Sequence, residues 1–256
     1  MNLLLLSIIC SNTALGVTPQ MLPEEALFSQ PFSDPLAPDS SLTIRGSAKS
    51  QAGIIGRLGL NRPIVQYDHG QIRTQIGFMA MAYMGFENDD ELTFGLRTFD
   101  GIFAVPLSVR FDETTVTLRW LHLSSHYADG VRADTELPSN TESTSLESLE
   151  LSISKTVGWV TGYQRFEWRY HTVHETSRYV GAFGLDVSPL GPTVPYASAF
   201  LYGDLDGGGL SGEVGLLARG PNTARVGISG YTGRPIPGKL DAERENYLGF
   251  TIVFSQ

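Results

Sequence analysis

The sequence predicts an all-β protein, a transmembrane antiparallel β-barrel of about twelve strands in an up-and-down meander. From Ser41 onward, short segments of alternating apolar and polar residues follow one another, separated by turn residues, which is the pattern of barrel strands. No apolar run approaches the ~20 residues of a membrane-spanning helix, so residence in a membrane must depend on strands. Charged residues make up only 18% of the chain, and its 28 glycines exceed ordinary usage of about 7%.

The first 40 residues differ from the rest. The apolar run Leu3–Cys10, followed by the small residues Ala14 and Gly16, predicts an export signal over residues 1–16. Residues 17–40 are rich in Pro, Ser and Asp with little periodicity, which indicates an extended periplasmic lead-in before a barrel over residues 41–256. Cys10 is the only cysteine, so the exported chain is expected to have no disulfide.

The barrel strands are recognised by period-two alternation, which places successive side chains on opposite walls. In residues 163–171, for example, Phe166, Trp168 and Tyr170 alternate with charged residues. A soluble β-sandwich remains an alternative for such a segment taken alone, because it would bury the aromatic rings instead of facing them to lipid. The predicted strands lie near 41–48, 52–60, 70–84, 92–111, 114–127, 146–156, 158–171, 177–188, 193–203, 209–219, 223–232 and 246–255.

An even number of strands places the first residue of the first strand and the last residue of the last strand on the same side of the membrane. That side is expected to be periplasmic, where the turns should be short. The connections around 112–113, 157, 189–192 and 220–222 are short and alternate with the others as this requires. The two longest connections, 128–145 and 233–245, fall on the outer side. The connection at 61–69 is an exception, because it is a rather long inner turn.

Two stretches carry a family resemblance. The first is Leu27–Pro35, with the letters LFSQPFSDP, and the second is Arg119–Gly130, with the letters RWLHLSSHYADG. In this order they resemble bacterial outer-membrane domain-of-unknown-function family 1207, which has a Phe-Pro…Ala-Asp-Pro lead-in and a His-x-Ser-Ser-His strand end. This chain has Ser33 in place of the usual alanine. The resemblance implies a barrel in the outer membrane and supplies no catalytic residues.

The last strand, 246–255, resembles the C-terminal signal by which outer-membrane barrels are recognised for assembly, although Ser255 and Gln256 follow its final aromatic residue. The expected partners are therefore the barrel-assembly machinery, through this strand, and outer-membrane lipids. The net charge of -9 argues against nucleic acid as a partner.

The cluster with the composition of a nucleophile and a base is His122–His126, with the letters HLSSH. His122 and Ser124 share one strand face with Trp120, so they point to lipid if Trp120 does, and parity alone leaves open whether that face is the lipid or the lumen face. His-x-Ser at the outer end of a barrel strand is similar to the arrangement in outer-membrane phospholipase A and the lipid A deacylases. The candidate catalytic residues are therefore His122 and Ser124, with Ser125 and His126 as secondary candidates.

Three points leave that hypothesis open. Leu121 and Leu123 would point into the lumen, which is awkward unless a bulge resets the register. The group that orients the base is undetermined, with Glu147, Glu150 and Asp129 as candidates by proximity. The alternative is a hydrogen-bonded polar rim where the strand leaves the membrane. No metal or other cofactor is expected, because His122 and His126 lie about 13 Å apart along a strand.

A second set of charged residues could line the lumen and set the selectivity of a small pore, or fill it as a structural network. Arg97 has the opposite parity and belongs to the set only if a bulge intervenes. The members of the predicted set are Asp100, Arg110, Arg165, Glu167 and Arg169.

Overall fold

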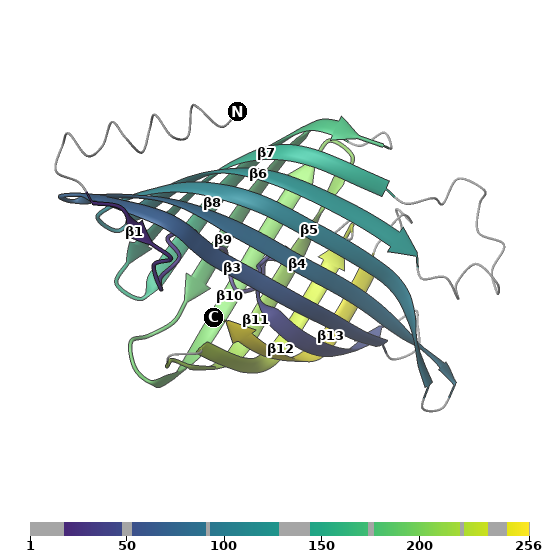
Figure 1. The fold of residues 1–256 in the computed structure, drawn as a ribbon. Coiled ribbons are helices and arrows are strands. Elements are labelled where there is room, and N and C mark those ends of the chain that lie inside the picture. Colours follow the sequence, from purple (N-terminus) through teal and green to yellow (C-terminus); the bar gives the residue numbers. More distant parts are fainter. Residues whose placement is uncertain are drawn as a thin grey trace.

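The computed structural model describes residues 18–47, 53–90, 93–127, 144–173, 177–220, 223–234 and 245–255. These residues form one antiparallel sheet in which each strand from β2 to β13 pairs with the next and β13 pairs with β2. The sheet therefore closes into a twelve-stranded meander barrel, which confirms the predicted fold class (Figure 1). The described residues contain no helix long and apolar enough to cross a membrane.

Except for β3 and β4, which extend well beyond the predicted 52–60 and 70–84, the strands follow the predicted segments closely, and the longest lie in the first half of the barrel. A two-residue strand, β1 (Gln20–Met21), pairs with the edge of β3 outside the ring. The barrel strands are β2 (Ser40–Ser47), β3 (Gly53–His69), β4 (Ile72–Asp90), β5 (Thr93–Phe111), β6 (Thr114–Tyr127), β7 (Thr144–Val157), β8 (Val160–Thr172), β9 (Tyr179–Val187), β10 (Thr193–Asp204), β11 (Gly207–Ala218), β12 (Thr223–Gly233) and β13 (Glu245–Ser255).

One end of the barrel, here called the turn end, carries the connections 70–71, 112–113, 158–159, 188–192 and 219–222. The first residue of β2 and the last of β13 also lie there, as an even strand count requires. The opposite end is called the loop end. The predicted long connections, 128–145 and 233–245, fall on it, but most of their residues lie outside the described part of the chain, as do the predicted signal segment and Cys10.

The predicted inner turn at 61–69 is wrong, because these residues continue β3 as far as His69. The pairing of β3 with β4 shifts by one residue between Pro63 and Val65, which is a β-bulge. Proline has no amide hydrogen to donate to the ladder, so it is tolerated at such an irregularity. Pro63 therefore made one long strand look interrupted, and the actual turn is the short Gly70–Gln71.

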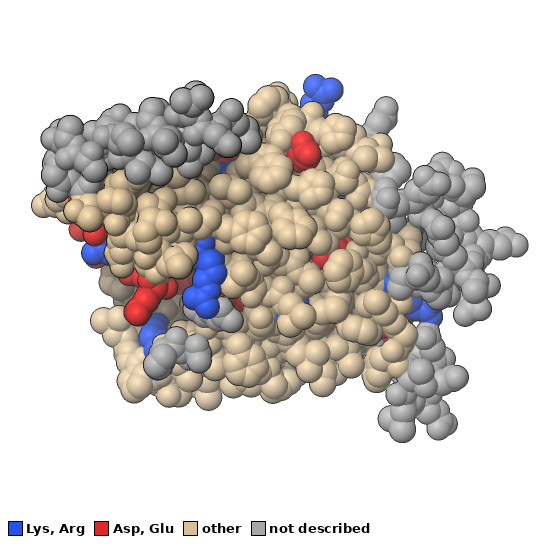
Figure 2. All heavy atoms as spheres, viewed as in Figure 1, with Lys and Arg blue, Asp and Glu red and all other residues tan. Residues whose placement is uncertain are grey.

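The two faces of the wall differ as alternation predicts. Large apolar side chains point outward and remain exposed, for instance Leu118 at 47% and Phe166 at 51%. Buried polar and charged side chains, including Arg119 and Glu150, point into the lumen. Figure 2 shows a face covered largely by uncharged side chains, with charged ones gathered near the end where β1 lies. A water-soluble protein has the opposite distribution, with apolar side chains inside and polar ones outside. Apolar side chains outside and polar ones inside are expected for a barrel wall in lipid.

Candidate functional site

The segment before β2 does not extend away from the barrel. The expected periplasmic lead-in, residues 17–40, is corrected by the contacts of its described residues. Leu27 and Asp34 are at most 1% exposed, and hydrogen bonds join the segment to inward-facing side chains of several strands. We call residues 25–39 the plug, because this part of the chain enters the lumen from the turn end and returns there to begin β2.

The plug is first fixed by Gln75, a buried residue of β4. Its side-chain amide donates to the backbone oxygen of Glu25 at 2.8 Å, and its side-chain oxygen accepts from the backbone N–H of Leu27 at 2.8 Å. Deeper in the lumen, the side chain of Asn61 donates to the backbone oxygen of Phe28 at 3.2 Å. Backbone groups of the plug therefore find partners on the wall, as buried polar groups must.

Asp34 is the deepest ionic contact of the plug. Its carboxylate accepts from Arg165 of β8 at 2.8 Å, and from Gln30 and the backbone of Leu36 at 2.8 and 2.9 Å. Arg57, on β3, donates at 3.5 Å to its backbone oxygen. One plug residue thus bridges walls formed by β3 and β8, so the plug crosses the lumen.

The other side of the plug is bound to β9–β12. The backbone N–H of Phe32 donates to Asp186 at 3.2 Å, and that of Ser33 donates to the Ser198 hydroxyl at 2.9 Å. Arg225 of β12 donates to the carboxylate of Asp39 at 2.8 Å, and its guanidinium lies 4.4 Å from the centre of the Phe32 ring.

An apolar cluster holds the middle of the plug and explains the inward leucines. Phe28 and Leu36 pack with Leu121 and Leu123 of β6, together with Met79 and other inward residues of β4 and β5. The pairing of β6 with β5 and β7 runs without a register shift, so no bulge is needed to accommodate the two leucines. Their apolar partners come from the plug.

The predicted lumen set faces inward, and its three arginines form ion pairs. Arg165 contacts Asp34, and its Nε lies 3.6 Å from Glu150; Arg169 donates to Glu167 at 2.9 Å. Arg110 reaches Glu25 of the plug at 2.9 Å. Asp100 is 1% exposed and also faces the lumen. The arrangement is a network joined to the plug rather than an open charged lining.

Arg97 also points into the lumen, because β5 contains the bulge that its membership of the lumen set required. The pairing of β4 with β5 shifts so that Arg97 is skipped, and its Nε lies 3.7 Å from the Glu87 carboxylate.

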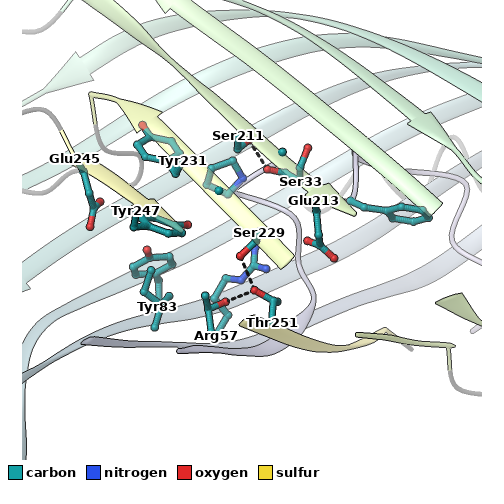
Figure 3. Close-up of a pocket in the computed structure, with 16 residues that line it drawn as sticks. Ser33, Arg57, Tyr83, Ser211, Glu213, Ser229, Tyr231, Glu245, Tyr247 and Thr251 are labelled. Atoms are coloured by element: carbon teal, nitrogen blue, oxygen red, sulfur yellow. Dashed lines mark hydrogen bonds between the residues drawn. The ribbon is translucent and has the colours of Figure 1, made fainter. Parts of the chain in front are cut away.

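Among the described residues, two of the cavities lie next to the plug. On the loop side, a small cavity of about 40 Å³ lies between Phe32 and Ser33 of the plug and a group of wall residues that includes Tyr83, Tyr231 and Tyr247 (Figure 3). That volume holds only a few water molecules. On the turn side, a polar vestibule of about 730 Å³ is lined by residues of β4–β7 and of the turns 70–71 and 112–113, with Ser29 of the plug.

The predicted catalytic pair lies on the outer wall. His122 and Ser124 alternate with buried Leu121, Leu123 and Ser125, so they share the outward face of Trp120. Ser125 is 2% exposed and points inward, away from the pair. His126 is exposed and lies on the outward face beyond the pair.

Two of the three candidate orienting groups lie within the described residues, and one of them is beside His122. Glu147 of β7 is the cross-strand partner of His122, and its carboxylate lies 3.7 Å from His122 Nδ1. Glu150 faces the lumen and pairs with Arg119. Asp129 lies outside the described residues. His171 is exposed and is paired in register with Glu147 from the other side, next to a bulge in β8.

Between the described side chains of His122 and Ser124 there is no hydrogen bond. Ser124 Oγ instead lies beside Gly101 of β5, where an added Cβ would come within 3.3 Å of it. A catalytic bond to His122 would therefore have to form when substrate binds, as is common for catalytic pairs that are not bonded in the free enzyme. Among the described residues, no group of three His, Cys, Asp or Glu side chains is placed to hold a metal ion.

Sequence reasoning missed the plug residues Glu25, Asp34 and Asp39 as lumen groups, and it missed His171. The plug contacts join residues more than a hundred positions apart, as for Asp34 and Arg165, and period-two alternation does not report such pairs. His171 depends on a bulge that alternation also cannot locate.

No family model and no curated protein sequence matches the chain. Among solved structures, the β-domain of the Bordetella autotransporter BrkA is similar at 12% identity and a TM-score of 0.46, covering 84% of this chain and 96% of that one. CdiB from Acinetobacter baumannii is similar at 11% identity and a TM-score of 0.34, covering 93% of this chain and 65% of that one. The description of the fold rests on the strand pairing of this chain itself.

Proposed function

We propose that this chain is an outer-membrane β-barrel whose lumen is closed at rest by its own N-terminal segment and whose working surface is its outer wall. The single observation that carries this proposal is the plug, which bridges opposite walls through Asp34 and fills the lumen with paired charges. A permanently open small pore is disfavoured by that filling.

The membrane location is supported by the outer wall. Outward side chains of β5 and β6 such as Phe103 and Leu118 are large, apolar and exposed, whereas buried polar groups point inward. Aromatic residues also collect on this wall, where the indole N–H of Trp120 donates to the Tyr170 hydroxyl at 2.7 Å. Apolar bands bordered by aromatic residues are the lipid-facing surface of outer-membrane barrels.

Two measurements test this proposal, one of conductance and one of extraction from vesicles. The refolded chain in a planar bilayer should show little steady conductance, and the same protein should resist extraction from vesicles by high salt or alkali. Steady conductance of a wide pore would overturn the closed lumen, and release from the vesicles would overturn membrane insertion.

A specific observation favours a second, sharper candidate, hydrolysis of lipid acyl esters at His122, Ser124 and Glu147. The Glu147 carboxylate lies 3.7 Å from His122 Nδ1, so Nε2 on the other side of the imidazole is available to a serine. The site follows Trp120 along β6, eight residues from Thr114 at the turn end, or roughly 20 Å of height for a strand tilted by about 40°. That is near the loop-side border of a band ~25 Å tall, where ester groups of the outer leaflet lie.

In this reaction, Ser124 Oγ attacks the ester carbonyl carbon while His122 Nε2 takes the hydroxyl proton. The bond from the carbonyl carbon to the alcohol oxygen then breaks, and the alcohol leaves with the proton held by His122. Water then adds to the acyl carbon and gives a proton to His122. The bond from that carbon to Ser124 Oγ breaks, Oγ takes the proton back from His122, and the fatty acid leaves. Glu147 orients His122 and stabilises the imidazolium formed in each half.

The test is fatty-acid release from phospholipid and lipid A vesicles by the refolded barrel. Ser124→Ala should abolish release, and Glu147→Gln should lower it by about a hundredfold or more. Ser125→Ala is the matched control, because the neighbouring hydroxyl points into the lumen and its loss should leave release unchanged. No release above the refolding blank, with or without calcium, would exclude this activity on these lipids.

We also propose a family and an assembly partner for the chain. The motifs at Leu27–Pro35 and Arg119–Gly130 support membership of family 1207, and the first of them forms the core of the plug. β13 supports recognition by the assembly machinery, because Leu248, Phe250 and Phe254 line its outward face. Deletion of residues 246–256 should prevent insertion in cells, whereas unimpaired insertion would contradict the signal.

A further inference from the structure

The turn-end vestibule contains two arginines on neighbouring strands in an unfavourable arrangement. Arg73 of β4 and Arg110 of β5 are direct cross-strand partners, and both belong to the inward face. Like charges directly opposite one another destabilise a strand pair. Such a pair persists most easily where an anion is held between its members.

In this structure the anion is part of the chain itself. The carboxylate of Glu25 lies 2.9 Å from Arg110 and 4.0 Å from Arg73. Its position is fixed because Gln75 binds the backbone oxygen of Glu25 at 2.8 Å. Asp68 lies 3.9 Å from Arg73, and the carboxylates of Asp112 and Glu113 belong to the lining of the same vestibule.

The Glu25 carboxylate is also accessible to solvent. Its side chain is 66% exposed, and both arginines line the vestibule of about 730 Å³. A small solute can therefore reach the two guanidinium groups without unfolding the wall. Exposed ion pairs of this kind are individually weak, so Glu25 can be displaced.

We propose that Arg73 and Arg110 form a binding site for a small dianion, phosphate-like in charge and size, at the turn-end mouth, and that Glu25 is its built-in competitor. Two guanidinium groups offer forked N–H donors that match the oxygens of a phosphate group. The site is separate from the outer-wall cluster of His122 and Ser124, so the proposal does not depend on hydrolase activity.

Phosphorus NMR titration of inorganic phosphate with the barrel refolded in a non-ionic, phosphate-free detergent tests the proposal. Glu25→Gln should tighten phosphate binding by about three- to tenfold, because a tethered competitor acts at an effective concentration in the millimolar range. Arg110→Gln, combined with Glu25→Gln, should abolish it. Circular dichroism confirms that each variant keeps its β-sheet.

Glu113→Gln is the matched control. Glu113 also lines the vestibule, and among the described ion pairs it takes no part, so its loss should change the affinity by about twofold at most through screened charge. Equal tightening by both variants would mean a general charge effect and would overturn the site. Absence of phosphate binding in the wild type and in Glu25→Gln alike would also overturn it.

Nanodiscs with and without phosphatidic acid, whose phosphomonoester headgroup can be a dianion, distinguish the source of the phosphate group. If the acidic lipid competes with free phosphate in Glu25→Gln, the occupant is a lipid headgroup. If free phosphate binds equally in both kinds of disc, the occupant is a soluble anion.

Discussion

The contact that should matter most to closure of the lumen is the pair formed by Asp34 and Arg165. Both side chains are at most 7% exposed and lie 2.8 Å apart. Asp34→Asn keeps the size of the side chain and removes its charge. Arg165 then retains Glu150, whose carboxylate lies 3.6 Å from its Nε. The plug loses its deepest ionic contact, and the wall keeps its own.

Breaking a buried ion pair by changing one partner costs about 3–5 kcal/mol, and the remaining Glu150 favours the lower end of that range. A loss of about 3 kcal/mol raises the ratio of undocked to docked plug by about a hundredfold, since each 1.4 kcal/mol is a factor of ten. The plug can withdraw without threading, because both its ends lie at the turn end.

Single-channel recording measures this ratio as the fraction of time that the barrel conducts. Asp34→Asn should open far more often than the wild type. In a Cys10→Ser background, cysteines at Ser33 and Ser198, whose hydroxyls are 2.8 Å apart, should form a disulfide that silences the openings until it is reduced.

Two outcomes would refute the reasoning. If Asp34→Asn stays as silent as the wild type, the ion pair does not hold the plug in place. If the disulfide-locked barrel conducts as freely as the unlocked one, the plug does not block the lumen.

Two further substitutions test the wall and the space that it leaves for the plug. Leu118→Arg places a charge in the middle of the outward face of β6 and should lower the free energy of unfolding from vesicles by about 2–4 kcal/mol, whereas Leu190→Arg, in an exposed turn, should change it little; equal effects would contradict a lipid-facing wall. Gly184→Val should displace the plug and increase channel openings, because even a Cβ at this position would lie 2.2 Å from Pro31 Cγ; unchanged silence would show that the plug adjusts around it.

Much of the barrel was predictable because period-two alternation is a pattern of residues close together in the sequence. The aromatic residues Phe166, Trp168 and Tyr170 were placed on the outward face by parity alone, and they are exposed in the structure. The same parity placed His122 and Ser124 outward. Register shifts were not predictable, and they account for the length of β3 and the inward turn of Arg97, because a single skipped residue reverses the parity of the rest of its strand.

The position of the plug depends on contacts between distant residues, yet the wall carried a local sign of it. A lumen filled with water or with charge pairs would not favour a band of apolar side chains on its wall. Met79, Leu121 and Leu123 nevertheless all have inward parity. Together they imply an apolar occupant supplied from elsewhere in the chain. Phe28 and Leu36 of the plug are that apolar occupant. Beside them, Asp34 and Asp39 form ion pairs with inward-facing arginines. An apolar patch on the lumen parity of a predicted barrel is therefore evidence for an internal plug, and the segment to search is one with both polar turns and a few large apolar residues at an end of the barrel.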